Sequence, residues 1–200
     1  MNYMFTTGHH SFLMPSEQIE ELEGSVFRSF CFAEPGFSEE HIELEAWKCR
    51  WAANMLNAEL YVLSNPDLAG LIKADGIILK RDDLPPNVVR SKLGSTIKIG
   101  GLSGNFDDAV NFLIEGVNFI LLGPLKTKAG VNEIGFDRLQ TIYGLLMQNK
   151  LSIPCYVFGG IEPDDIAKLT NLGIDGVSVS SFILTEDEIN IKAQEFNKRG

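Results

Sequence analysis

The sequence predicts an α/β fold, a single (β/α)8 TIM barrel. Eight short runs rich in β-branched and aromatic residues alternate with helix-period segments along the whole chain, which is the pattern of βαβ units and a parallel sheet. Runs such as residues 119–122 are apolar on both faces, as expected for strands covered by helices. Eight strands is the number at which such a sheet closes into a barrel.

The strand candidates are residues 3–7, 25–32, 60–63, 76–79, 96–99, 119–122, 153–158 and 176–179. The glycine-rich run 100–104 lacks the spacing of a dinucleotide-binding loop, and we interpret it as a loop that follows the fifth strand. Residues 16–23 offer only about two turns of helix. The sequence therefore allows a barrel that is irregular, or that lacks a helix, near its N-terminus.

Two of the intervening helices have clear start signals. One begins at Ser38, and the other begins at Pro163 and ends at Gly173. The apolar face expected for the first is made of Ile42, Ala46, Trp47, Trp51, Met55 and Leu56. Both tryptophans are thus predicted to pack between the helix and the barrel.

The composition indicates a single domain and argues against some classes of binding partner. The 200 residues include 44% hydrophobic residues, which suits one domain over residues 1–200. A formal net charge of −10 argues against nucleic acid and anionic membranes as partners. No leader-like or bilayer-length apolar segment stands out, and a homo-oligomer is left open.

The cysteines and histidines show no metal-binding or disulfide pattern. Cys31, Cys49 and Cys155 are odd in number and have no Cys-x-x-Cys spacing, which favours a reducing, cytoplasmic setting. The histidines at positions 9, 10 and 41 have no ligand-like spacing to an acid, so we expect them at the surface.

The strongest functional motif is Gly159-Gly160, placed between a strand and the helix begun by Pro163. Paired glycines let the backbone approach a ligand and point its N–H groups at an anion. Ser180 and Ser181 follow the last strand, and the loops after strands seven and eight of such barrels commonly bind phosphate. Together they predict a pocket for a phosphorylated small molecule.

Two further segments are candidates for the same site. Thr127 and Lys128, after the sixth strand, could fold over an anion, although solvated loop lysines are an equally good reading. Asp83, after the fourth strand, could bind Mg2+, although paired surface acids usually bind nothing.

A series of short motifs follows in consistent order over residues 60–184: Leu63-Ser64-Asn65-Pro66-Asp67-Leu68-Ala69, Ala74-Asp75-Gly76-Ile77, Asp83-Leu84-Pro85, Gly123-Pro124, Gly159-Gly160-Ile161 and Asp175-Gly176-Val177 to Ser181. In these motifs the chain resembles the thiamine-phosphate synthase and TenI superfamily, as a divergent member. The resemblance implies a transferase that joins a pyrimidine diphosphate to a thiazole phosphate with loss of pyrophosphate, using Mg2+.

The resemblance also implies roles for individual residues. Gly159, Gly160, Ser180 and Ser181 would bind the thiazole phosphate through backbone N–H groups, and Thr127 with Lys128 would close over it. Lys128 and Arg28 would be catalytic, and Asp83 would hold the metal. Arg28 is the one basic remnant, in residues 26–30, of the motif that serves the pyrimidine diphosphate.

The metal and diphosphate half departs from the family pattern. Leu63-Ser64 stands where synthases have Asn-Asp, which removes one metal carboxylate. TenI proteins are metal-free thiazole tautomerases with a histidine where this chain has Pro124. Besides a synthase of thiamine biosynthesis, a TenI-like tautomerase and a non-catalytic phosphate-binding protein therefore remain as alternatives.

Overall fold

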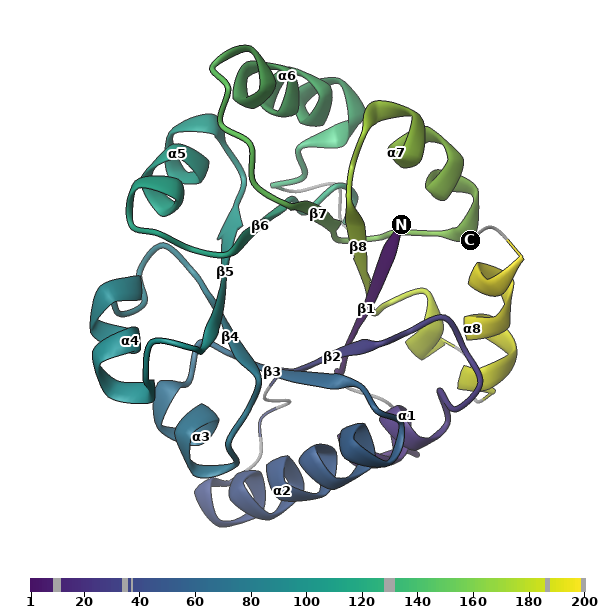
Figure 1. The fold of residues 1–200 in the computed structure, drawn as a ribbon. Coiled ribbons are helices and arrows are strands. Elements are labelled where there is room, and N and C mark those ends of the chain that lie inside the picture. Colours follow the sequence, from purple (N-terminus) through teal and green to yellow (C-terminus); the bar gives the residue numbers. More distant parts are fainter. Residues whose placement is uncertain (9–11, 34–35, 37, 128–131, 186–187, 199–200) are drawn as a thin grey trace.

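The computed structural model describes all residues except 9–11, 34–35, 37, 128–131, 186–187 and 199–200. Eight parallel strands close into a barrel in chain order, and β8 pairs with β1 (Figure 1). The strands are β1 (Asn2–Thr6), β2 (Ser29–Phe32), β3 (Glu59–Leu63), β4 (Gly76–Leu79), β5 (Lys98–Ser103), β6 (Phe119–Leu122), β7 (Cys155–Phe158) and β8 (Gly176–Val179). The predicted (β/α)8 barrel is confirmed.

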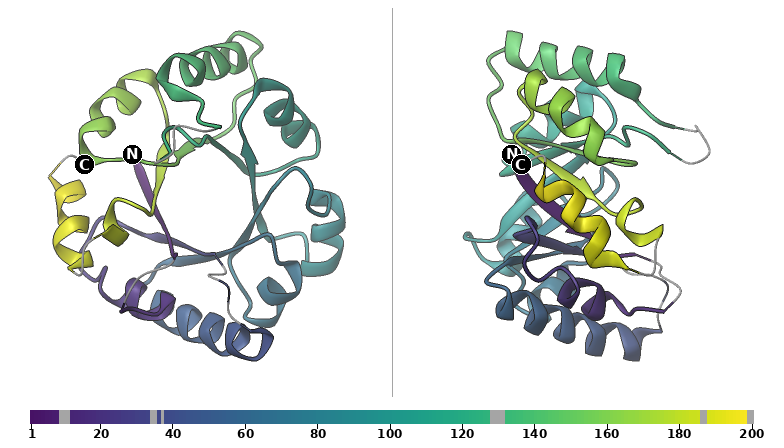
Figure 2. Two further views of the ribbon diagram at one scale, coloured as in Figure 1. Left: turned by 180° about the vertical axis from the view of Figure 1, so that it is seen from behind. Right: turned by 90° about the vertical axis from the view of Figure 1, so that its right-hand side faces the viewer.

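A helix follows each strand and lies outside the barrel, as the end and side views show (Figures 1 and 2). The helices are α1 (Pro15–Glu20), α2 (Glu39–Met55), α3 (Pro66–Leu71), α4 (Pro86–Leu93), α5 (Phe106–Ile114), α6 (Gly135–Gln148), α7 (Ile166–Leu172) and α8 (Ile189–Asn197), with 3-10 turns η1 (Pro163–Asp165) and η2 (Ile183–Thr185). The first helix is therefore present, though short, and the barrel is complete on that side.

Residues 100–103 of the glycine-rich run lie in β5 and not in a loop, which corrects the sequence prediction. A Cβ atom on Gly100 would lie 2.6 Å from the Phe119 ring, and one on Gly101 would lie 2.5 Å from the Phe112 ring. The two rings occupy the volume that side chains on the strand would need. These strand positions are glycine because the rings leave no room for a side chain. The sequence prediction of a loop relied on the frequent occurrence of glycine in turns.

Two other strands begin later than predicted. β7 begins at Cys155 because Pro154 has no N–H to donate to the ladder. β2 begins at Ser29, and residues 25–28 form its approach, where the Ser25 hydroxyl donates to the Leu22 carbonyl at 2.6 Å. The buried Phe27 ring in this approach packs edge-to-face against Tyr3 and Phe196. Phe27 is therefore apolar because it packs in the core, although it does not lie in a strand.

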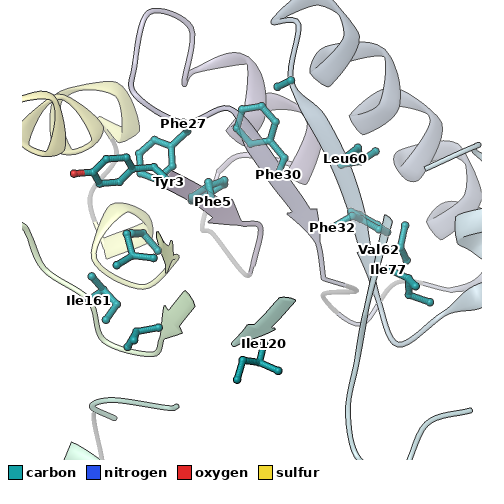
Figure 3. Packing of buried hydrophobic residues seen from close by; sticks show 14 of the residues in the cluster. Tyr3, Phe5, Phe27, Phe30, Phe32, Leu60, Val62, Ile77, Ile120 and Ile161 are labelled. Carbon is teal, nitrogen blue, oxygen red and sulfur yellow. The ribbon is translucent and has the colours of Figure 1, made fainter. Parts of the chain in front are cut away.

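Side chains on alternate strand positions divide the core into two regions. One set fills the inside of the barrel and consists of Met4, Cys31, Tyr61, Ile78, Phe119 and Leu121. The other set, which includes Phe5, Phe30, Leu60 and Val62, packs in the larger cluster with the surrounding helices (Figure 3). This two-sided burial explains the continuous apolar runs in the sequence.

The apolar face predicted for α2 is wrong for its largest side chains. Trp47, Trp51 and Met55 are exposed, while Ala46 and Cys49 are fully buried. The neighbouring Ala52 and Ala53 are buried too. Small side chains on the inner face let α2 lie close to the rest of the fold, and the tryptophans are consequently turned outward.

Two further observations concern the cysteines and the length of the helices. All three cysteines are free and buried. Among the residues that the structure describes, no helix combines the length and apolarity needed to cross a bilayer.

Candidate functional site

The Gly159-Gly160 turn follows β7 in a conformation that requires glycine. Its φ angles are +90° and +60°, a region that L side chains rarely adopt. A Cβ atom on Gly159 would lie 2.5 Å from the Pro124 side chain, and one on Gly160 would lie 2.8 Å from Lys126. The paired glycines are therefore needed both for the backbone conformation and for the close approach of the loop after β6.

Backbone hydrogen bonds fix that loop against the turn. The Leu125 N–H donates to the Phe158 carbonyl at 2.7 Å, and the Lys126 N–H donates to the Gly159 carbonyl at 3.1 Å. The Gly123–Pro124 peptide bond at the start of the loop is cis. As a result, the ends of β6 and β7 form one wall of a shared pocket.

The end of β8 forms the opposite wall. The N–H groups of Ile183 and Leu184 both donate to the Ser180 carbonyl at 3.1 Å, which starts the 3-10 turn and leaves its first N–H groups unused. Within the described chain, no protein acceptor takes the N–H of Gly160, Ser180 or Ser181. Unused N–H groups at two neighbouring strand ends are what an oxyanion needs.

A pocket of about 610 Å³ lies between these walls. It is lined by Pro124, Lys126, Thr127, Phe158, Gly159, Gly160, Glu162, Ser181 and Phe182. The structure thus brings together four of the residues that the sequence singled out for phosphate: Thr127, Gly159, Gly160 and Ser181. Ser180 is adjacent but does not line the pocket, and Lys128 lies outside the described residues.

Lys126 is the cation that lines the described part of this pocket, and sequence reasoning passed over it in favour of the next lysine. Its ammonium lies 2.7 Å from the Asp165 carboxylate and 3.8 Å from that of Glu162. The Thr127 N–H donates to the Glu133 carboxylate at 3.0 Å. Since acids surround the lysine, its charge is balanced until an anionic ligand competes for it. The sequence feature that could have identified Lys126 is its position next to Thr127.

The end of β3 carries a strained and unsatisfied serine. Ser64 has a φ of +57°, and its hydroxyl is buried without a hydrogen-bond partner. Asp83, after β4, accepts the Lys80 N–H at 2.7 Å. No group of three histidine, cysteine or acidic side chains among the described residues could hold a metal ion. The described side chains by themselves therefore do not form a closed metal site here.

Arg28, which the resemblance assigns a catalytic role, lies at the other end of the barrel and is not brought together with the pocket residues. It precedes β2, and its guanidinium donates to the carbonyls of Ser25 at 2.7 Å and Phe27 at 2.8 Å. A four-residue strand separates it by roughly 13 Å from the edge that carries the pocket. The segment that does follow β2, residues 33–40, contains no lysine or arginine.

Sequence comparisons with known proteins show one family. A family model described as thiamine monophosphate synthase matches residues 4–183. The chain is 35% identical over 152 residues to a thiamine-phosphate synthase of Flavobacterium johnsoniae, covering 74% of this chain and 69% of the relative. It is 29% identical over 152 residues to that of Alkaliphilus oremlandii, covering 74% of this chain and 70% of the relative.

Solved structures show the same fold. The thiamine phosphate pyrophosphorylase from Pyrococcus furiosus superposes with a TM-score of 0.85 at 20% identity, covering 98% of this chain and 94% of that one. The thiamine phosphate pyrophosphorylase from Bacteroides thetaiotaomicron superposes with a TM-score of 0.71 at 12% identity, covering 100% of this chain and 97% of that one.

Proposed function

Because the chain belongs to the thiamine monophosphate synthase family, we propose that it is the transferase of thiamine biosynthesis that makes thiamine phosphate. In the proposed reaction, hydroxymethylpyrimidine diphosphate loses pyrophosphate as its methylene carbon–oxygen bond breaks. The thiazole nitrogen of the thiazole phosphate then bonds to that carbon. We propose the cytoplasm as its compartment, where its three free cysteines would stay reduced.

One observation carries the proposal: Gly160 and Ser181, from the ends of β7 and β8, line one pocket, and no protein acceptor in the described chain uses their N–H groups. An oxyanion held there would accept several N–H hydrogen bonds without needing a net positive surface. Such local capture suits a chain with a net charge of −10. We therefore assign the thiazole phosphate to Gly159, Gly160, Ser180 and Ser181.

The loop after β6 completes the phosphate half of the proposed site. Thr127 lines the pocket. We assign its hydroxyl to binding the phosphate, and we assign Lys128 to closing over the ligand. Lys126 adds a second positive charge from the same loop. Its release from Asp165 on phosphate binding would exchange one anionic partner for another.

Mg2+, which the family typically uses, would supply charge neutralisation for the departing pyrophosphate. Mg2+ is usually held by one or two carboxylates together with substrate phosphates, and Asp83 at the end of β4 supplies one carboxylate. The Ser64 hydroxyl, which is buried without a hydrogen-bond partner, stands at the end of the neighbouring strand β3. We propose Asp83 as the protein ligand.

The experiment is an incubation of the protein with Mg2+, hydroxymethylpyrimidine diphosphate and thiazole phosphate, followed by detection of thiamine phosphate. We expect product that disappears with Gly160→Asp, because this change places a side chain and a negative charge at the phosphate site. A second synthase assayed under the same conditions is the positive control.

The failures have different meanings. If no product forms but calorimetry shows thiazole phosphate binding that Gly160→Asp removes, the protein is a non-catalytic phosphate binder and the synthase proposal fails. If the protein exchanges the thiazole ring proton without Mg2+, as followed by NMR, it is a tautomerase. If no phosphate compound binds, the assignment of the pocket fails as well.

A further inference from the structure

Helix α2 has the opposite of the usual arrangement of side-chain sizes. Its inner face carries Ala46, Cys49, Ala52 and Ala53, each at most 1% exposed. Its outer face carries the large apolar side chains. The small inner residues account for its close packing, so nothing in the barrel requires large apolar residues on the outer face.

The outer residues form one continuous surface, which we name the α2 stripe: Leu44, Trp47, Trp51 and Met55. Their exposed fractions are 58%, 45%, 60% and 64%. Successive members are separated by three, four and four positions, so all four lie on one face of the helix. Figures 1 and 2 show α2 on the outer rim of the molecule.

The stripe is large for a surface that water covers. With about 150–250 Å² for a large side chain, these fractions amount to roughly 340–570 Å² of apolar surface. This range is comparable to the largest patch on a typical monomer, roughly 300–600 Å². Trp47 and Trp51 are also the only two tryptophans in the chain, and tryptophan is enriched in protein interfaces.

We propose that the α2 stripe binds the stripe of a second copy of this chain, with the two α2 helices antiparallel about a twofold axis. The order of the stripe is nearly symmetric about Cys49. In an antiparallel pair, Leu44 of one copy therefore faces Met55 of the other, and Trp47 of one copy faces Trp51 of the other. The twofold axis repeats each contact with the roles of the two copies exchanged. Self-complementarity of this kind is what a twofold interface requires.

The area also matches a second copy. Two stripes together would bury on the order of 1,000 Å², which is the size that a specific interface must reach. Exposed Glu43, Lys48 and Asn54 on the same helix provide a polar rim that adds to this area. Lys48 lies next to the symmetry centre, where it would meet a tryptophan ring of the other copy.

The arrangement leaves the proposed phosphate pocket free. α2 follows β2 and runs back along the outside of the barrel, whereas the pocket lies at the ends of β6 to β8. Antiparallel α2 helices point the pocket ends of the two barrels in opposite directions. Both copies carry a net charge of −10, so screening by salt should strengthen the association, unlike an association held by ion pairs.

The first test is sedimentation velocity of the full chain over a range of micromolar concentrations. We expect a dimer whose population rises with salt, and a monomer for Trp51→Glu and for Met55→Glu. The matched control is Ile114→Glu, which changes a residue that is 79% exposed on α5 and should leave the dimer intact. Because both tryptophans lie in the stripe, their emission should shift to the blue as the dimer forms.

A cross-linking experiment tests the antiparallel arrangement. Lys48→Cys should form a covalent dimer under mild oxidation, because the two copies of position 48 lie near the axis, and the native cysteines are buried. Arg138→Cys, exposed on α6 on the far side of the barrel (Figure 1), should remain monomeric in the same assay. A dimer in which neither cysteine cross-links would overturn the arrangement.

Three results would overturn the interface itself. One is a wild-type chain that remains a monomer at every concentration. Another is loss of the dimer in Ile114→Glu but not in the stripe variants. The third is a monomer whose tryptophan emission shifts only when anionic lipid vesicles are added, which would assign the stripe to a membrane surface.

Discussion

The ammonium of Lys126 lies 2.7 Å from the carboxylate of Asp165, and a Cβ atom on Gly160 would lie only 2.8 Å from the same lysine. The lysine is thus held beside the proposed phosphate site by an acid from the start of the helical segment that follows the glycine turn. This relationship makes its charge available to a ligand without leaving it unpaired when the pocket is empty.

The two partners of this ion pair should respond differently to substitution: loss of the lysine should weaken phosphate binding, and loss of the acid should not. Lys126→Met should weaken binding by roughly tenfold or more, as expected for the loss of a charged hydrogen bond. Asp165→Asn should bind as tightly as the wild type or tighter, since the amide oxygen can still accept the Glu162 N–H. Calorimetric titration with thiazole phosphate measures both, and equal affinity in all three proteins would remove Lys126 from the site.

The glycine turn should be intolerant of even one methyl group. Gly160→Ala should abolish ligand binding, because the Cβ atom displaces Lys126 and the φ of +60° is strained for alanine. Gly135→Ala is the control, since its φ is +66° but no atom lies within 4 Å of the new Cβ. It should lose about 1 kcal/mol of stability and keep its affinity. Equal affinity of the two variants would contradict the proposed site.

Ser64→Asp should restore a carboxylate at the end of β3. The φ of +57° at this position is one that aspartate tolerates better than most residues. We expect a lower Mg2+ concentration for half-maximal synthase activity, because a second carboxylate joins Asp83. Ser64→Asn keeps the shape without the charge and should leave the Mg2+ requirement unchanged. The idea fails if both variants respond alike.

The cysteines should be chemically inert while the protein is folded. Burial disfavours the charged thiolate and raises the pKa of Cys31 and of Cys155 to about 12, and it raises the pKa of Cys49 as well. Alkylation follows the thiolate fraction, so we expect slow modification at pH 8 and rapid modification of all three thiols in denaturant. Mass spectrometry after iodoacetamide treatment would reveal any cysteine that reacts in the folded state.

Two glycines should respond in opposite ways to the same substitution. Gly76→Ala in β4 should destabilise the protein by about 1–3 kcal/mol or more, because the new Cβ would lie 2.3 Å from the Tyr61 ring and 2.6 Å from the Lys98 carbonyl. Gly144→Ala in α6 meets no atom within 4 Å and should stabilise by about 0.5–1 kcal/mol. Urea unfolding measures the difference, and a stable Gly76→Ala protein would contradict the packing at that strand.

Sequence patterns identified the barrel because they report on local physics. Alternation of short strands with helical segments, and runs such as residues 119–122 that are apolar on both sides, depend only on which faces are buried. The Gly159-Gly160 turn could be predicted equally well, since its positive φ angles restrict the choice of residue at each position. That Gly159, Gly160 and Ser181 line one pocket could therefore be predicted from the order of the motifs.

The remaining features depended on contacts between distant parts of the chain. Gly100 and Gly101 belong to a strand because Phe119 and Phe112 cover them, and no local rule reveals those rings. Arg28 looked like a remnant of a catalytic motif until the start of β2 at Ser29 placed it at the opposite end of the barrel. Lys126 became important only through Asp165, nearly forty residues away.

The sequence by itself determined the number and order of the strands and the glycine turn. Each of these follows from the conformation or the burial of a short segment. Only the tertiary structure decided which face of α2 is covered, because that depends on the space left between the helix and its neighbours. Small residues fill that space, and the tryptophans consequently lie on the outside.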